Sequence, residues 1–525
     1  MSQGSAPRQA DLFRDTAAFV EPLVRPDSIH ALLARECHAL FPDELFDDLF
    51  AANVGRRSVP PLVVAVVMVL QRLEGLSDRE AVERFTFDAR WKYAAGGLPF
   101  DAPGFAHTVL VDMRARLARS ERPERIFERT LEVARAAGLV GIRRVLDSTP
   151  LYDAVATMDT VTLVRSAIRG VLAASGGREP ALRQVLRRDD DYSTGGKPAA
   201  NWDDADARAA LVDALARDGE AVLGALEGKP LEAPLAEAAV LLATVLGQDL
   251  EDGPDGRIRI ARKVAPDRVI STVDPEARHG HKTNHRSFDG YKGHIALDPD
   301  HELVTAVAVT AGNAGDASVA LDLLETELAS PAGLDAPSVT VYGDSAYGAG
   351  PVLAALDAAG ATCRVKVQPP SGHPGMFTKD EFAIDLAAGT VTCPAGRVTR
   401  LTRHHHGSLQ ARFGAVCATC PLASRCTAAR HGRRIEVGPH ERCLTSARAA
   451  SNDPAWRADY RATRPLVERK LAHLVRRKHG GRRARMRGRL KVGADFALLA
   501  AAVNLARLAI LGVTGSGGTW AVRSA

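Results

Sequence analysis

The sequence is poor in cysteine and lacks the patterns of exported proteins. Its 525 residues include seven cysteines, four of them between positions 393 and 426. Cysteines this few and this clustered do not suit a disulfide framework, so we expect a reducing, cytoplasmic setting. Residues 1–18 lack a basic segment followed by an apolar run, so we expect no secretory signal.

A clean membrane-spanning run is also missing. The nearest candidate is residues 496–513, but Asn504 and Arg507 interrupt it. This pattern favours an amphipathic or buried helix that closes a domain, and we expect no membrane partner.

Acidic residues are scarce in one stretch near the C-terminus. Charged residues make up 25% of the chain and hydrophobic ones 46%, which is ordinary for globular protein, and the net charge is only +5. Residues 464–491, however, carry twelve lysines and arginines and a single acid, Glu468. Such a local concentration of positive charge suits a polyanionic partner better than the modest total suggests.

Glu468 stands out within this stretch. On a helix it falls on the apolar side with Val467, Leu471 and Val475, opposite a basic arc that includes Lys470. A buried carboxylate needs a cation, a hydrogen bond or a metal. The alternative is a solvated basic helix in which Glu468 makes an ordinary ion pair with Arg464.

The chain is too long for one core, and its pattern changes divide it into six segments. Helical patterns fill residues 1–140, strand patterns residues 141–157, and helical patterns again residues 158–270. Strands return in residues 271–369, with a hairpin expected over residues 291–309, a helix over 317–328 and a strand over 338–344. Residues 370–450 are loop-rich and contain most of the cysteines, and helices dominate residues 451–525.

Two of the expected strands end on an acid, Asp147 and Asp344. Together with Glu468, these acids could converge at the carboxyl edge of a sheet. Convergent carboxylates bind Mg²⁺ or Mn²⁺, and a pair of such ions can promote phosphodiester displacement. Taken by itself, each aspartate is more simply interpreted as the cap of a turn. Asp316, nearby, is interpreted as the N-cap of the next helix.

Several blocks resemble the DDE transposases of bacterial insertion sequences. The three acidic blocks are Leu146-Asp147-Ser148-Thr149, Tyr342-Gly343-Asp344-Ser345-Ala346-Tyr347, and Arg464 followed by Glu468-Arg469. The segments 290–294 and 309–316 are similar to the connecting blocks of that family, and residues 57–147 are similar to its N-terminal helical domain. Tyr460, four residues before Arg464, departs slightly from the usual spacing.

This resemblance implies an α/β fold: an RNase-H-like mixed sheet core, interrupted by a helical insertion (158–270) and a cysteine-rich insertion (370–450), with an all-α N-terminal domain (1–140) that binds DNA ends. The implied catalytic residues, which also hold Mg²⁺ or Mn²⁺, are Asp147, Asp344 and Glu468. The implied partners are double-stranded DNA, as terminal inverted repeats and target, and further copies of the chain on that DNA, in the nucleoid. The rival interpretations are a nuclease of the same fold without strand transfer and a catalytically inactive DNA-binding regulator.

Basic residues near these blocks are candidates for DNA contact. Lys292 and His294 lie in the block 290–294, although lysines on strands are often simply exposed. The others lie on or after the Glu468 helix. They are Arg464, Arg469, Arg476, Arg477, Lys478, Arg482, Arg483 and Arg485.

The clustered cysteines give an independent signal. Cys417 and Cys420 form a Cys-x-x-Cys pair, with Cys426 six residues on and Cys393 upstream. Four thiolates suit a structural Zn²⁺, which would supply folding energy that a small core cannot. The alternative is reduced thiols in a loop; Cys443 and nearby histidines are possible substitutes as ligands.

Overall fold

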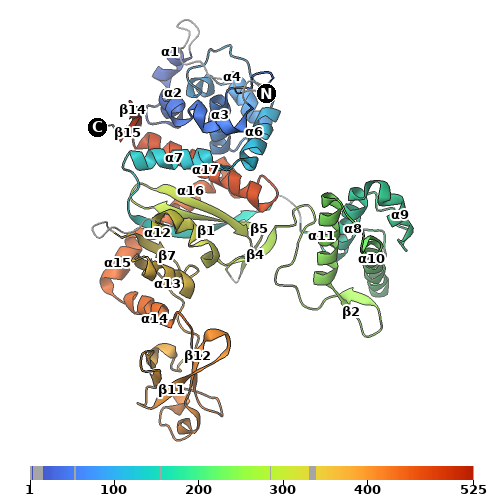
Figure 1. The fold of residues 1–525 in the computed structure, drawn as a ribbon, viewed down its shortest axis with the longest axis vertical. Coiled ribbons are helices and arrows are strands. Elements are labelled where there is room, and N and C mark those ends of the chain that lie inside the picture. Colours follow the sequence, from blue (N-terminus) through green and yellow to red (C-terminus); the bar gives the residue numbers. More distant parts are fainter. Residues whose placement is uncertain are drawn as a thin grey trace.

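The computed structural model describes residue 3 and residues 16–51, 55–153, 157–283, 285–329 and 338–523. A central mixed sheet carries a helical region at one end, a small antiparallel sheet at the other and a helical bundle at its side (Figure 1). The chain is therefore mixed α/β with an N-terminal helical region, as expected. Most of residues 1–18, inspected for a secretory signal, lies outside the described residues.

The N-terminal region is helical because its apolar residues recur at helical spacing and its helix ends are capped. Helix α3 starts at a Pro-Pro pair and is buried along most of its length, and a capping box of Ser77 and Glu80 starts α4. The helices are α1 (Ala17–Val20), α2 (Ile29–Leu40), α3 (Pro61–Glu74), α4 (Asp78–Phe87), α5 (Ala89–Ala94), α6 (Thr108–Arg119) and α7 (Arg125–Ala136).

The central sheet joins antiparallel and parallel strands. Its strands are β1 (Arg143–Tyr152), β4 (Arg278–Thr283), β5 (Arg286–Asp298), β6 (Leu303–Ala311), β7 (Thr340–Gly343) and β8 (Thr362–Val365). Strand β5 is antiparallel to β1, β4 and β6, whereas β7 is parallel to both β1 and β8. The predicted hairpin is confirmed as β5–β6. We predicted that the first strand ends at Asp147, but β1 continues to Tyr152.

Both faces of the sheet are covered by helices. Alternate side chains of β1 enter different cores: Val145 packs into the core shared with the N-terminal helices, and Leu146 packs into a second core with α13 (Gly350–Ala358). The helix predicted over residues 317–328 is broken into two 3₁₀ turns and the short α12 (Glu325–Ala329).

Three C-terminal helices complete the central body: α15 (Pro454–Thr463), α16 (Pro465–Leu474) and α17 (Arg489–Ile510). Helix α17 is the one described helix long and apolar enough to cross a membrane, but 67% of its most apolar window is buried inside the structure. Asn504, which interrupts the apolar run, forms two hydrogen bonds with the backbone of Val304 on β6. Helix α17 is therefore a core helix, as predicted, and the hairpin β14 (Val513–Ser516) and β15 (Thr519–Val522) follows it.

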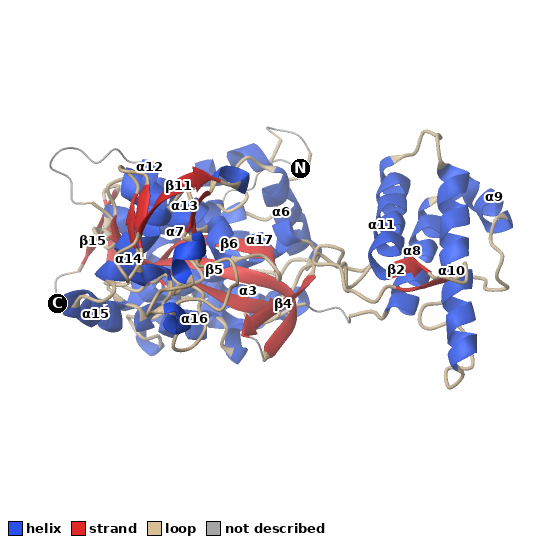
Figure 2. Ribbon diagram, turned by 90° about the horizontal axis from the view of Figure 1, so that it is seen from below, coloured by secondary structure: helices blue, strands red, loops and turns tan. Residues whose placement is uncertain are grey.

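The segment between β1 and β4 forms a helical bundle with its own core (Figure 2). Leu163, Ile168 and Leu242 are completely or almost completely buried in it. Its elements are α8 (Thr160–Ala174), α9 (Glu179–Gln184), α10 (Ala205–Leu226), α11 (Ala233–Asp249) and the hairpin β2 (Leu250–Asp252) and β3 (Ile258–Ile260).

The cysteine-bearing region is more ordered than the loop-rich segment we predicted. It forms a five-stranded antiparallel sheet followed by α14 (Glu441–Ala450). Its strands are β9 (Ala383–Asp385), β10 (Thr390–Thr392), β11 (Val398–Arg403), β12 (Leu409–Arg412) and β13 (Arg434–Val437). The prediction failed because these strands are short and rich in arginine, so their apolar alternation is weak.

Candidate active site

Strand pairing brings Asp147 and Asp344 together. Strands β1 and β7 run parallel, and the last pair of residues in their register is Val145 and Tyr342. Asp147 and Asp344 each follow two residues later in the sequence, so they come side by side. Backbone amides fix both carboxylates: Ser148 donates to Asp147 at 2.8 Å, and Ala346 donates to Asp344 at 2.9 Å.

Arg464, at the junction of α15 and α16, contacts all three predicted acids. Its Nη2 lies 3.1 Å from Asp147 Oδ1 and 3.6 Å from Asp344 Oδ2. Its Nη1 lies 3.4 Å from Glu468 Oε1, one helical turn along α16. The two aspartate oxygens share one nitrogen, so they lie well within the roughly 10 Å that a shared pair of ions can span.

The three carboxylates differ in exposure. The side chain of Asp147 is 14% exposed, that of Asp344 43% and that of Glu468 66%. We expected Glu468 on the apolar side of its helix, and this is wrong: α16 packs against the sheet through Val467 and Leu471, and Glu468 lies at the flank. Lys470, assigned to the basic surface, is buried instead, and burial lowers its pKa to about 8.

Burial and charge act against each other at this site. Burial raises the pKa of Asp147 to about 6, although Arg464 and the Ser148 amide favour its ionised form. Burial lowers the pKa of Arg464, but the carboxylates of Asp147 and Asp344 outweigh it and hold that pKa above its usual value. The Nε of Arg464 is buried without a hydrogen-bond partner among the described residues. The site therefore concentrates acidic oxygen atoms around one cation.

Aromatic residues of α15 support the turn that carries Asp344. The Tyr460 hydroxyl donates to the carbonyl of Gly343 at 3.2 Å, and the Tyr460 ring stacks on Trp456 with 4.9 Å between centroids. Lys366 covers the same ring at 4.6 Å. Burial raises the pKa of Tyr460 to about 12, so the hydroxyl remains a donor. Tyr460 thus helps to position the turn that carries Asp344, a role that the sequence alone did not indicate.

A second polar cluster lies beside the acids, centred on Asp316. Lys292 Nζ contacts Asp316 at 2.9 Å, and the Ser148 hydroxyl donates to the other Asp316 oxygen at 2.6 Å. The prediction that Asp316 caps a helix is wrong, because Gly315 occupies the cap position. Only the position of Asp316 within the family-like block 309–316 could have indicated this role.

His294 cannot contact DNA phosphate in this structure. It is completely buried, and its ring nitrogens contact the hydroxyls of Thr310 at 2.9 Å and Tyr347 at 3.2 Å. Burial lowers its pKa to about 4, so the ring is neutral. The predicted phosphate contact is therefore wrong for His294. Lys292 remains a candidate for contact with DNA phosphate, although it already forms an ion pair with Asp316.

The basic segment after α16 is pinned to the fold and is not a solvated tail. The Tyr152 amide donates to the Arg482 carbonyl, and the Ala484 amide donates to the Tyr152 carbonyl. Residues 478–480 also lie against Gly75, which caps α3 with a φ of +70°; a Cβ there would stand 2.5 Å from the Lys478 carbonyl oxygen. The chain is therefore held close to both the sheet and the N-terminal helices.

The predicted DNA-binding residues between positions 464 and 485 divide into two groups. Arg464 is bound to the carboxylates, Arg485 donates to the Leu76 carbonyl at 2.6 Å, and Arg469 contacts Glu302 at 2.6 Å. The remaining side chains are exposed and free to meet a partner's phosphates. They are Arg476, Arg477, Lys478, Arg482 and Arg483.

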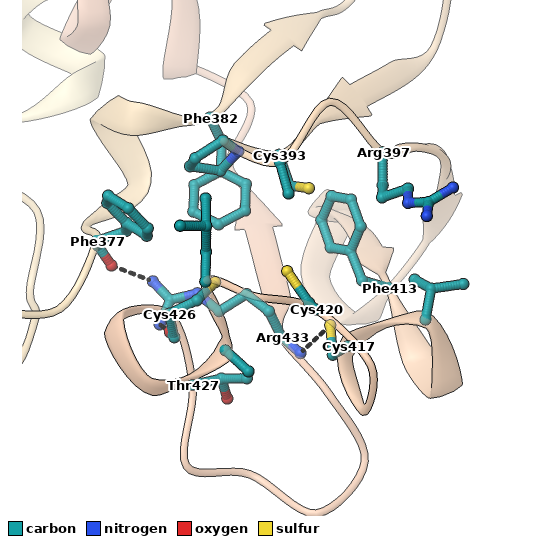
Figure 3. A pocket seen from close by; sticks show the side chains of 15 residues that line it. Phe377, Phe382, Cys393, Arg397, Phe413, Cys417, Cys420, Cys426, Thr427 and Arg433 are labelled. Carbon is teal, nitrogen blue, oxygen red and sulfur yellow. Dashed lines mark hydrogen bonds between the residues drawn. The ribbon is translucent and has the colours of Figure 1, made fainter.

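The predicted zinc site is not supported. Cys393, Cys417, Cys420 and Cys426 do line one cavity of about 20 Å³ (Figure 3). However, the described residues contain no group of three or more His, Cys, Asp and Glu side chains arranged to hold a metal ion. Phe382 and Phe413 line the same cavity, and burial raises the pKa of Cys426. Cys426 belongs to the small apolar core of this sheet, and Cys393 and Cys417 pack against that core.

Comparison with known families adds to this geometry. Residues 392–509 match a family described as Transposase DDE domain, and residues 21–116 match a second one, the transposase domain DUF772. Both matches support the identification of this chain as a DDE transposase of an insertion sequence. No curated protein and no solved structure gave a significant match.

The two matches cover different parts of this DDE transposase. The first includes Glu468, Arg464, the four clustered cysteines and strands β11 to β13, so the cysteine-bearing region is not confirmed as an insertion. The second covers most of the N-terminal helical region. Asp147 and Asp344 lie outside both matches. The family makes the protein a DNA-acting enzyme, and such domains generally use divalent metal ions.

Proposed function

We propose that this transposase cleaves DNA at the ends of its insertion sequence and joins those ends to target DNA, with Asp147, Asp344 and Glu468 as catalytic residues. The observation that carries the proposal is the meeting of these carboxylates, from three separate elements, on one guanidinium. Hard carboxylate oxygens are the ligands that Mg²⁺ and Mn²⁺ prefer, so the donor set fits such ions.

The bound ions would polarise the scissile phosphate and activate the attacking oxygen. Asp147 is the deepest ligand and is oriented by the Ser148 amide, while Asp344 is oriented by Ala346. Arg464 supplies the positive charge that keeps the three carboxylates together. Glu468, the most exposed of the three, is free to change its position.

The remaining assignments belong to the same proposal. The strand order, with β5 antiparallel to both β6 and the central β1, and with β7 and β8 parallel to β1, supports an RNase-H-like core. We assign residues 1–140 to binding of DNA ends, and residues 141–157, 271–369 and the helix of Glu468 to the core. We further propose assembly of several copies on DNA in the nucleoid of the cytoplasm.

The experiment combines the purified protein, duplex DNA carrying the flanks of its own element, and supercoiled target DNA in Mg²⁺. We expect cut ends covalently joined to the target. Cleavage without joining would instead favour a nuclease of the same fold. DNA binding with neither reaction would favour an inactive regulator.

A further inference from the structure

The cysteine-bearing sheet carries a second concentration of positive charge, separate from the segment after α16. Residues 386–440 contain eight arginines and no lysine, and their one acidic residue is Glu436. Five of these arginines lie in or just before the strands of the sheet. They are Arg397, Arg400, Arg403, Arg412 and Arg434.

Strand pairing places three of them side by side. Arg412 on β12 stands opposite Arg434 on β13. Arg400 on β11 adjoins Leu401, which stands opposite Ala411, so Arg400 comes opposite Arg412. We call Arg400, Arg412 and Arg434 the arginine row.

The row points away from the core of this small sheet. The neighbouring residues Leu401, Ala411 and Ile435 face the core that contains the cysteines, and side chains alternate between the two faces of a strand. All three arginines are exposed. Like charges placed opposite each other on adjacent strands destabilise a sheet, so the fold gains nothing from this arrangement.

The row is also free of acidic partners. Among the residues that the structure describes, none of its three arginines makes an ion pair; Arg412 Nε donates to the neutral side chain of Gln410. Arginines on the adjacent α14 differ, because Arg442 contacts Asp357 at 2.7 Å and Arg448 contacts Asp380 at 2.9 Å. The row therefore presents three guanidinium groups at the spacing of adjacent strands, with the exposed Glu436 on the same face, two residues along β13 from Arg434.

We propose that the arginine row binds the phosphate backbone of duplex DNA outside the catalytic centre. The inference rests on the proposed function insofar as DNA is the substrate. Guanidinium groups bind phosphate oxygens in a bidentate manner. A single strand would require exposed rings for base stacking, but Phe382 and Phe413 are buried against each other, 5.8 Å apart.

The location of the sheet defines what this contact adds. The sheet lies at the opposite end of the central body from the N-terminal helices (Figure 1). A duplex held by the row extends the protein–DNA interface beyond the part that the N-terminal helices reach. Because phosphates carry no sequence information, this contact strengthens binding to every sequence alike.

The test uses the full chain and a triple variant, Arg400→Gln, Arg412→Gln and Arg434→Gln. Affinity for a duplex of unrelated sequence is measured over a range of salt concentrations. The log–log slope should become shallower by about 0.9 for each lost phosphate contact, so by nearly three overall. Replacing the same arginines with lysine should keep most of the slope. The Gln variant should melt no earlier than the wild type, because it loses like-charge repulsion.

The matched control removes three arginines of the helical bundle that do have acidic partners: Arg183, Arg217 and Arg259, paired with Glu179, Asp213 and Glu251. Changing these to Gln alters the net charge equally and should leave the slope unchanged. Equal slopes for the wild type and the arginine-row variant would overturn the inference, as would a slope change confined to single-stranded DNA. Metal-dependent cleavage by the wild type, measured in parallel at saturating DNA, reports separately on the proposed function.

Discussion

Replacing Arg464 with methionine should destabilise the metal-free protein by an amount that grows with pH. The substitution leaves Asp147 buried without its cation, and breaking a buried ion pair can cost about 3–5 kcal/mol. Protonating Asp147 costs less free energy than leaving its carboxylate buried without a cation. Its pKa is already about 6, because burial disfavours its charge. Protonating it therefore costs about 1.4 kcal/mol at pH 7 and about 2.7 kcal/mol at pH 8. These values cap its share of the loss; Asp344 and Glu468 are more exposed and add little.

The assay is urea denaturation of the wild type and Arg464→Met in EDTA at pH 6, 7 and 8. The difference in unfolding free energy should rise with pH, since the ionised form of Asp147 is the one that has lost its partner. The double variant Arg464→Met/Asp147→Asn should lose this pH dependence. Mn²⁺ should restore the single variant more than the wild type, because ligand binding stabilises the folded state. A difference that is constant from pH 6 to 8, or one that Asp147→Asn leaves unchanged, would refute the reasoning.

Three further outcomes follow from the structure. His294→Gln should reduce the stability that the protein loses between pH 6.5 and pH 4, by up to about 3 kcal/mol in urea denaturation at pH 4. The reason is that the wild-type ring has a pKa of about 4 in the folded protein and is protonated more readily once the protein unfolds. An unchanged dependence of stability on acid pH would contradict this. Gly75→Ala should lower the free energy of unfolding by about 1–3 kcal/mol, because its φ is +70° and a Cβ would meet the Lys478 carbonyl. The melting temperature is the measurement. Gly138→Ala is the control, because Gly138 also has a positive φ but has open space around it. Replacing three exposed arginines of the basic segment with Gln should flatten the salt dependence of DNA binding equally on all sequences, and an unchanged slope would exclude phosphate contacts there. These arginines are Arg482, Arg483 and Arg487.

Local patterns in the sequence were sufficient to predict the helices, the hairpin and the two aspartates. The apolar run of α3, the capping box at Ser77 and the alternation in β5 and β6 each depend on neighbouring residues alone. The convergence of Asp147 and Asp344 could be expected once both were placed on strands, because adjacent parallel strands bring corresponding residues together.

Other features depend on tertiary contacts that a periodic pattern does not contain. A helical wheel put Glu468 inside and Lys470 outside, but the buried face of α16 includes Lys470 and leaves Glu468 exposed. His294 looked available for DNA, yet the pairing of β5 with both β1 and β6 buries it. Asp316 looked like a cap because its partners, Lys292 and Ser148, come from two other strands.

The cysteine spacing predicted a zinc site, which the described residues do not support. A Cys-x-x-Cys pair places two sulfurs near each other but does not decide what surrounds all four. Here Phe382 and Phe413 line the same small cavity as the cysteines. The arginine row was missed for a related reason: its members are far apart in the sequence and meet only through the pairing of β11, β12 and β13.

The most direct test of the central claim is metal-dependent cleavage of element-end DNA by three single variants, Asp147→Asn, Asp344→Asn and Glu468→Gln. Each variant should retain DNA binding, because the phosphate contacts come from basic residues. Each should cut at least about a thousandfold more slowly than the wild type in Mg²⁺, which corresponds to several kcal/mol of lost transition-state stabilisation. Wild-type rates of cleavage in any one of the three variants would contradict the assignment of that carboxylate to the catalytic centre.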